Sequence, residues 1–200
     1  MIVVRYGWIG VLFICLLPLL LLINGLFNND LGPNPIETLI SSTGEWGLRF
    51  LCLTLIVTPL RYIGLHFLAP FRRQFGLWAA AYSTLHFFLY CWFEQEGSIS
   101  AIIDDIVMRP FIAVGILTLC LFMPLILTSH RKMVIKMGIQ YWQALHRLVY
   151  LIALLALTHF ILLVKKDMTM PLIYGGVIVS LLAIRLIRYG YRKNIQRHSA

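Results

Sequence analysis

The sequence predicts an all-α integral membrane protein: a single domain, spanning residues 1–200, built as a bundle of six transmembrane helices with both termini in the cytoplasm. Three observations predict this class. Of the 200 residues, 60% are hydrophobic and 12% are charged, whereas about 25% of residues are charged in soluble domains. The mean hydropathy is +0.84. Apolar runs long enough to cross a bilayer alternate with short connections, and basic residues gather on one side of them.

Six apolar runs are the expected spans. They cover residues 6–27, 47–63, 74–93, 110–128, 142–164 and 171–189. The first run follows Arg5 in the manner of a signal peptide, but it is long enough to span and no small-residue cleavage site follows it, so an uncleaved helix is expected. Pro18 and Pro124 should kink their helices. Pro59 lies near a helix end, where neighbouring helices can cover the carbonyl it frees.

The distribution of charge orients the bundle. If the N-terminus is cytoplasmic, 13 of the 17 Lys and Arg residues lie in inner segments, and the four outer ones are Arg49, Arg109, Lys165 and Lys166. All eight acidic residues then lie at the outer side. By the positive-inside rule both termini are cytoplasmic, as expected for a multi-pass protein of the bacterial inner (cytoplasmic) membrane. The basic C-terminal segment RLIRYGYRKNIQRH is explained by anionic membrane lipid rather than by nucleic acid.

Three histidines lie inside the expected spans: His86, His146 and His159. An imidazole in hydrocarbon is costly and is usually partnered, and neutral imidazole is a common axial ligand of haem iron. His86 lies about 18 Å from the inner end of its helix, and His159 lies about 20 Å further out than His146. His86 and His159 therefore share a level, which suits ligation of one haem between two helices, whereas His146 lies at the inner level.

Helix geometry complicates this arrangement. The 13 residues from His146 to His159 leave the two side chains about 140° apart on an ideal helix. Both can face one interior only if a π-type bulge corrects the phase, or if the helix is surrounded on both sides. Two other roles for the histidines stay open: hydrogen bonds to backbone or hydroxyl groups across the bundle, and a proton relay in a small proton-coupled transporter.

Four stretches of the chain resemble a known family: TGEWGLRFLCLTLIVTPLR, GLWAAAYSTLHFFLY, MRPFIAVGIL and WQALHRLVYLIALLALTHF. They look like the MsrQ (YedZ) family, haem-binding membrane subunits of periplasmic methionine sulfoxide reductase systems within the wider ferric-reductase-like transmembrane group. The resemblance implies that His86, His146 and His159 are axial ligands of haem b. Two-haem members of the wider group carry a further histidine where this chain has Arg72, so either one or two haems are expected.

Four arginines are candidate contacts for haem propionates or a flavin phosphate, because the guanidinium group binds such anions in a bidentate manner. Arg72 and Arg73 lie at the inner mouth, and Arg49 and Arg109 lie at the outer one. Anchoring to the inner leaflet is an equally good account of the inner pair.

The chain has no GxGxxG or P-loop motif, so it is not expected to oxidise NAD(P)H by the usual fold. The resemblance implies electrons from the quinol pool or from a flavin reductase, FMN as a further cofactor, and a periplasmic MsrP-type molybdopterin reductase as acceptor. The expected function is a haem-containing electron-transfer subunit for repair of oxidised periplasmic proteins, rather than a catalyst by itself. A standalone ferric reductase is the alternative from the same group. The acidic outer loop around Glu94 and Asp105 is the expected docking surface for the acceptor.

Overall fold

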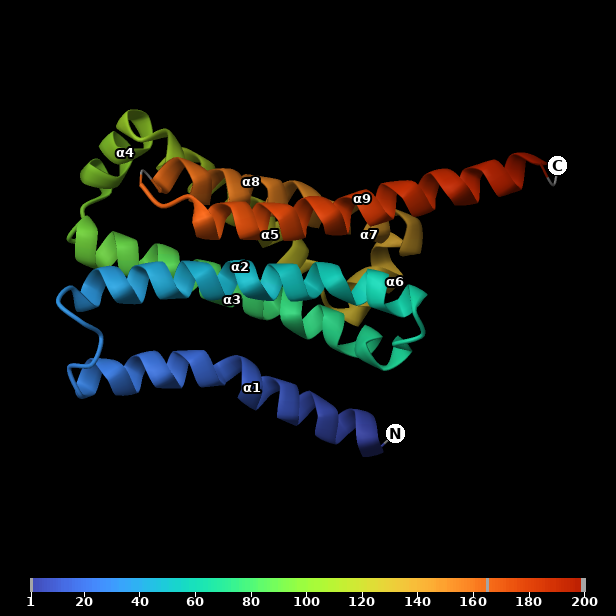
Figure 1. Cartoon of the computed structure of the whole chain (residues 1–200), viewed down its shortest axis with the longest axis horizontal. Helices are drawn as coiled ribbons and strands as arrows, with labels where there is room; N and C mark the ends of the chain where they lie inside the picture. Colours follow the sequence, from blue (N-terminus) through green and yellow to red (C-terminus); the bar gives the residue numbers. More distant parts are fainter. Residues whose placement is uncertain (1, 165, 199–200) are drawn as a thin grey trace.

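The computed structural model describes residues 2–164 and 166–198, with side-chain surroundings for residues 7–164 and 166–191. Within these residues the chain is helical and contains no strand. The long helices lie side by side along one direction (Figure 1). They are α1 (Ile2–Phe27), α2 (Pro35–Tyr62), α3 (Arg72–Leu89), α5 (Pro110–Leu127), α8 (Leu148–Leu163) and α9 (Thr169–His198). The shorter ones are α4 (Ile99–Met108), α6 (Arg131–Met137) and α7 (Ile139–His146), with a 3₁₀ helix at His66–Phe71 and a π-helical turn at Tyr90–Glu94.

Four helical segments of the described chain are long and apolar enough to cross a membrane. They are Gly7–Phe27, Pro110–Leu127, Ile139–Leu163 and Thr169–Tyr191. The expectation of an all-helical membrane protein is therefore confirmed. α2 and α3 are also long, but both carry charged residues, which lower their hydropathy.

The structure corrects the boundaries of several expected helices. α2 begins at Pro35 rather than at residue 47. Pro is well suited to the first helical position. The polar residues that follow it lower the hydropathy of this segment, so the apolar run begins later than the helix. The expected span at 142–164 is two helices, α7 and α8, that meet at Arg147. α4 and α6 were not expected, because they are shorter than a membrane span.

Pro18 and Pro59 are each compensated by a side chain from a neighbouring helix. The Tyr82 hydroxyl of α3 accepts from the Leu19 N–H at 3.1 Å and donates to the Cys15 carbonyl at 3.0 Å, so it is inserted into the hydrogen-bond ladder of α1 beside Pro18. α1 is visibly bent (Figure 1). Pro59 cannot donate to the Leu55 carbonyl, and the Arg185 guanidinium of α9 donates to that oxygen instead.

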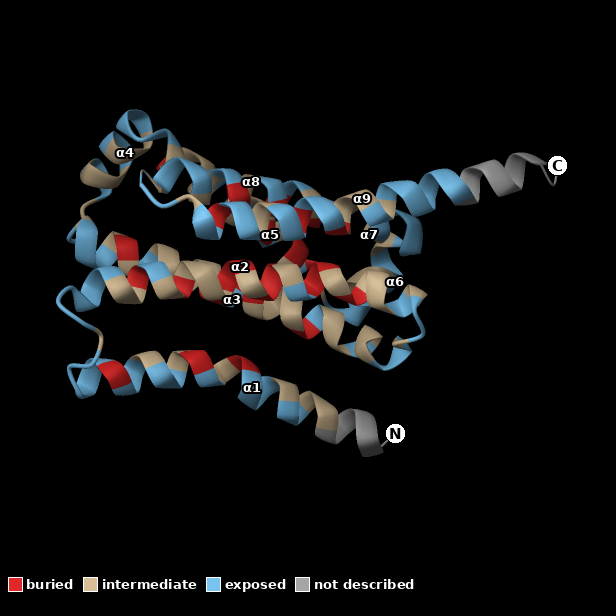
Figure 2. Cartoon of the chain, viewed as in Figure 1, coloured by how far each residue is buried: buried red, intermediate tan, exposed pale blue. Residues whose placement is uncertain are grey.

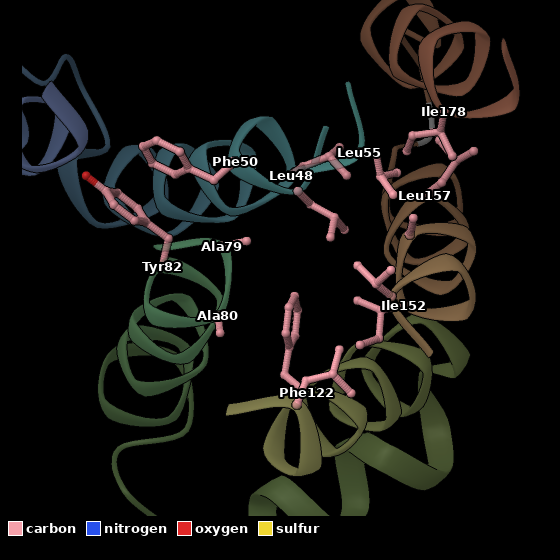
Figure 3. Close-up of a cluster of buried hydrophobic side chains, with 14 of the residues drawn as sticks. Leu48, Phe50, Leu55, Ala79, Ala80, Tyr82, Phe122, Ile152, Leu157 and Ile178 are labelled. Carbon is pink, nitrogen blue, oxygen red and sulfur yellow. The ribbon is translucent and has the colours of Figure 1, made fainter. Parts of the chain in front are cut away.

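The core lies between α2, α3, α5, α8 and α9. Its most deeply buried large side chains include Leu55, Tyr82, Ile152 and Ile178, and Figure 3 shows several of them converging. The outward faces of the long helices carry exposed apolar side chains, and burial follows the inward faces (Figure 2). Such extensive exposed apolar surface is typical of contact with lipid.

The beginning of α1 and the end of α9 lie at the same end of the bundle, next to the α2–α3 connection and α6 (Figure 1). α4 lies at the opposite end. The number of crossings and the side of the membrane on which the termini lie stay predictions.

Candidate functional site

His86 of α3 and His159 of α8 face each other across the bundle. Their ring centroids are 6.1 Å apart, and their ring planes are nearly perpendicular, at 81°. The expectation that these two histidines share one level of the bundle is thus met by the structure.

Each of the two rings is held by a backbone carbonyl. The Nδ1 atom of His86 lies 2.8 Å from the Ile40 oxygen, and that of His159 lies 2.6 Å from the Phe111 oxygen. Because a carbonyl oxygen only accepts, Nδ1 carries the proton in both rings. In a neutral imidazole this leaves the lone pair on Nε2, the arrangement found in metal-bound histidines, whose other nitrogen donates to a carbonyl or carboxylate.

A glycine lies against each ring. A Cβ atom at Gly44 of α2 would lie 3.0 Å from Nδ1 of His86, and one at Gly115 of α5 would lie 2.8 Å from Nδ1 of His159. The same arrangement therefore occurs twice: the glycine admits the imidazole, and the carbonyl four residues before it holds Nδ1. Sequence reasoning missed both glycines, and the only signal in the sequence is the presence of a Gly within α2 and within α5.

The two imidazoles project into an outer cavity whose walls are mostly apolar. Its lining includes Leu48, Leu51, Ile112, Leu119 and Phe122, together with the polar residues Ser41, Ser83, Glu45 and Glu94. Two imidazoles that share one metal ion have ring centres about 6 Å apart, since each metal–nitrogen bond is about 2.0 Å and each ring centre lies about 1 Å behind its nitrogen. The observed separation, the Nδ1 bonds and the glycine cradles all fit a haem held between the rings.

No group of three or more His, Cys, Asp or Glu side chains that could hold a metal ion occurs in the described residues. Two facing histidines suit a metal whose other ligands come from a prosthetic group, as the porphyrin nitrogens do in haem proteins.

His146 lies apart from this pair, in a second, inner cavity whose lining also includes Leu51, Arg72, Arg73, Phe122 and Tyr150. Its Nε2 is 3.1 Å from the Thr128 hydroxyl oxygen, and its ring stacks on Trp142 with centroids 4.1 Å apart. Because the Thr128 hydroxyl donates to the Pro124 carbonyl at 2.6 Å, it accepts from His146. The nitrogen that is free in the other two histidines is therefore occupied in His146.

His146 and His159 do not lie on one continuous helix, because α7 and α8 meet at Arg147. The Arg147 amide donates to the Ala144 carbonyl at 3.2 Å, a tighter pattern than that of an α-helix. His146 lines the inner cavity and His159 the outer one. The junction is a tightened turn rather than a π bulge; the π turn at Tyr90–Glu94 follows His86.

The four candidate arginines fall into two groups. Arg72 and Arg73 line the inner cavity. Arg49 pairs with Glu45 at 2.6 Å and donates to the Tyr174 hydroxyl, and Arg109 pairs with Asp105 at 3.2 Å. Neither Arg49 nor Arg109 lines either of the two described cavities, and their role as anion contacts stays a prediction.

The acidic outer loop is partly committed to internal contacts. Asp105 accepts from the Tyr90 hydroxyl at 2.8 Å and from Gln95 at 2.9 Å, in addition to its pairing with Arg109. Glu94 lines the outer cavity. His66 and His130 line neither cavity. Several predicted charges have side chains outside the described residues: Arg5, Lys165, Arg192, Lys193, Arg197 and His198.

The fold and the site define a class of protein: a helical membrane domain with a facing, half-buried imidazole pair between its helices. The family model for the ferric reductase like transmembrane component matches residues 43–157, and the chain belongs to that family. No solved structure matches the chain.

Within that class, several relatives share one description, "Protein-methionine-sulfoxide reductase heme-binding subunit MsrQ". The protein from Rhodospirillum rubrum is 45% identical over 184 residues, which cover 92% of this chain and 88% of the relative. The protein from Azospira oryzae is 44% identical over 86% of this chain and 75% of the relative, and that from Caulobacter vibrioides is 43% identical over 86% and 82%. The chain therefore belongs to the MsrQ family, and the resemblance expected from the sequence is confirmed.

Proposed function

We propose that this chain is a membrane electron-transfer subunit that binds one b-type haem between His86 and His159. The observation that carries the proposal is the facing pair of imidazoles 6.1 Å apart, each with Nδ1 bonded to a backbone carbonyl. The names of its relatives, which describe a haem-binding subunit, support the same cofactor.

The residues of the chain hold and insulate the cofactor, which supplies one-electron chemistry when bound. The carbonyls of Ile40 and Phe111 fix the tautomer and the orientation of the imidazoles. Gly44 and Gly115 let the rings approach the neighbouring helices. The apolar wall of the outer cavity excludes water and lowers the local dielectric, which tunes the reduction potential.

The proposed topology has six crossings, formed by α1, α2, α3, α5, α7 with α8, and α9. Both termini are cytoplasmic, and the membrane is the bacterial inner membrane. The support is the asymmetry of Lys and Arg and the placement of the start of α1 and the end of α9 at one end of the bundle. His86 and His159 then lie in the periplasmic half, on the route to an outer acceptor.

The proposed acceptor is a periplasmic MsrP-type molybdopterin reductase, and the proposed donor is the quinol pool or a flavin reductase, with FMN as a second cofactor. The support for the acceptor is that the relatives are named as subunits of a methionine sulfoxide reductase. Reduction of methionine sulfoxide reverses an oxidative lesion and consumes electrons, which a membrane subunit of this kind supplies.

The test is the haem content of the purified protein. Wild-type protein should show a Soret band and a pyridine haemochrome signal of about one haem per polypeptide, as expected for one pair of axial imidazoles. His86→Ala and His159→Ala should each lose most of that signal. Colourless wild-type protein, or full haem content in both variants, would refute the proposal.

A further inference from the structure

The short helix α4 lies at the end of the bundle opposite to the start of α1 and runs at a steep angle to the long helices (Figure 1). Its N-cap residue is Ser98, whose hydroxyl accepts the Ala101 N–H at 3.3 Å. With 10 residues α4 is too short to cross a bilayer. It is therefore an element of the bundle end and not a further span.

The inward side of α4 is attached to the rest of the structure. Asp105 accepts from the Tyr90 hydroxyl at 2.8 Å and from the Gln95 amide at 2.9 Å. Ile102 and Ile106 lie next to Asp105 on the helix surface, and both are half-buried. These contacts fix the orientation of α4 about its own axis, and its other side points away from the bundle.

The exposed surface of α4 is divided into two rows. Ile99, Ile103 and Val107 follow one another at intervals of four residues, and their exposed fractions are 73%, 55% and 80%. Side chains at this spacing lie one above the other on a helix, so they form a continuous apolar row. Ser100 and Asp104 are exposed as well and form a polar row beside it. α4 is thus amphipathic over its exposed surface.

The chain on both sides of α4 places the helix at the surface of the membrane. Arg109 alone separates α4 from α5, whose residues Pro110–Leu127 form a candidate membrane span. Before α4, the π-helical turn carries Trp92 and Phe93, and both side chains are exposed. Exposed aromatic residues at the end of a membrane bundle are typical of the interface between hydrocarbon and water. α4 lies between these two markers of the interface.

The apolar row is too narrow for a stable contact with another protein. It has three side chains, whereas a stable protein interface takes roughly 20–30 residues on each side. α4 contains two acidic residues and no basic one, so its partner is not an anionic lipid headgroup. An amphipathic helix at the interface lies with its apolar side chains below the headgroups and its polar side chains in water.

We propose that α4 is an interfacial helix whose apolar row inserts among the acyl chains of zwitterionic phospholipid, in the leaflet at its end of the bundle. Ser100 and Asp104 then face the water. Because Asp105 is bonded to Tyr90, which lines the outer cavity, the lipid contact supports one wall of the site of the imidazole pair. This leaflet is the periplasmic one in the proposed topology, and the contact does not depend on haem binding.

The experiment uses the full-length protein in nanodiscs of phosphatidylcholine. The photoreactive residue p-benzoylphenylalanine replaces Ile103 in one variant and Asp104 in a second, so the two probes lie side by side on the same helix. The reference for lipid contact is the same replacement of Leu117, an exposed residue of the α5 span. After irradiation, the mass of the intact protein shows whether phospholipid is attached.

The probe at position 103 should give a phospholipid adduct in a yield close to that at position 117. The probe at position 104 should give no more adduct than a sample kept in the dark. An unchanged thermal transition, followed by circular dichroism, checks the fold of each variant. Should the probe at position 103 destabilise the protein, the same replacement of Val107, which belongs to the same row, carries the test.

Three results overturn the proposal. They are the absence of a lipid adduct at positions 103 and 107, equal lipid adducts at positions 103 and 104, and attachment of a protein in place of lipid at position 103 when intact cells are irradiated. The last result identifies a protein partner for the apolar row instead. None of these measurements involves haem, so failure of this proposal is distinguishable from failure of the proposed function.

Discussion

Gly115 lies directly against the ring of His159: a Cβ atom at position 115 would approach Nδ1 to 2.8 Å and Cε1 to 2.9 Å. The first prediction follows from this contact. Gly115→Ala should displace the imidazole and weaken haem binding about 10- to 100-fold, the usual effect of disturbing the support of a metal ligand. The measurement is haem retention during dilution or competition with apomyoglobin.

The control for this change is Gly176→Ala in α9, where an added Cβ meets nothing within 4 Å. It should retain haem like the wild type. Gly44→Ala, with a contact of 3.0 Å to His86, should resemble Gly115→Ala. Equal haem retention in all three variants would show that Gly44 and Gly115 are not needed to position the two imidazoles.

The second prediction concerns the hydroxyl of Tyr82. Tyr82→Phe leaves the Leu19 N–H and the Cys15 carbonyl without the bridge beside Pro18, so the protein should lose about 1–3 kcal/mol of stability. The measurement is thermal unfolding in detergent, followed by circular dichroism. Tyr141→Phe, at a ring that is 75% exposed, is the control and should leave the transition unchanged; a similar loss in both would contradict this role for Tyr82.

The third prediction couples Arg185 to Pro59. Arg185→Gln should destabilise the protein, because it removes the donor to the Leu55 carbonyl. In a Pro59→Ala background the Leu55 carbonyl regains its helical N–H donor. Arg185→Gln should then lower the free energy of unfolding by about 0.5–3 kcal/mol less than it does in the wild-type background. A double-mutant cycle of unfolding free energies measures this coupling. If the effects of Arg185→Gln and Pro59→Ala on the unfolding free energy simply add, Arg185 does not stabilise the protein through the Leu55 carbonyl.

The fourth prediction concerns the partition between the two cavities. Phe122 is 4% exposed and lines both cavities. Phe122→Ala should join them and admit water from the inner side, which favours the more charged ferric haem and lowers its midpoint potential. Potentiometric titration of the Soret band measures the shift. Phe122→Leu, which keeps much of the volume, should shift it less; an equal potential in all three proteins would show that the outer cavity is sealed by other residues.

The level of the histidines was predictable from the sequence, because helix rise and membrane orientation convert residue numbers into depth. The backbone carbonyls and glycines that contact the imidazoles were not predictable from the sequence. Nothing in the spacing of Gly44 or Gly115 indicates which imidazole lies over it, since that depends on which helices pack together. The course of the chain at Arg147 was equally hidden: the sequence predicts a phase conflict, but a tightened turn has no signal of its own.

The remaining differences have similar causes. α2 begins at Pro35, and its polar first turns resemble a loop to any reading based on hydropathy. Arg49 and Arg109 were candidate anion contacts because of their charge and depth, but each has an acidic residue four positions earlier on its own side of the bundle. Local pairing of this kind is favourable on a helix and competes with any role at a cavity.

The central claim is that His86 and His159 are the two axial ligands of one haem. The most direct measurement is the electron paramagnetic resonance spectrum of the ferric protein, recorded for the wild type, His86→Ala, His159→Ala and His146→Ala. Two imidazole ligands give low-spin iron, and rings at 81° should give a strongly anisotropic signal. If His86 and His159 are the ligands, this signal is present in the wild type and in His146→Ala and is lost in the other two variants. A high-spin wild type, or a low-spin signal that survives in His86→Ala or His159→Ala and disappears in His146→Ala, would contradict it.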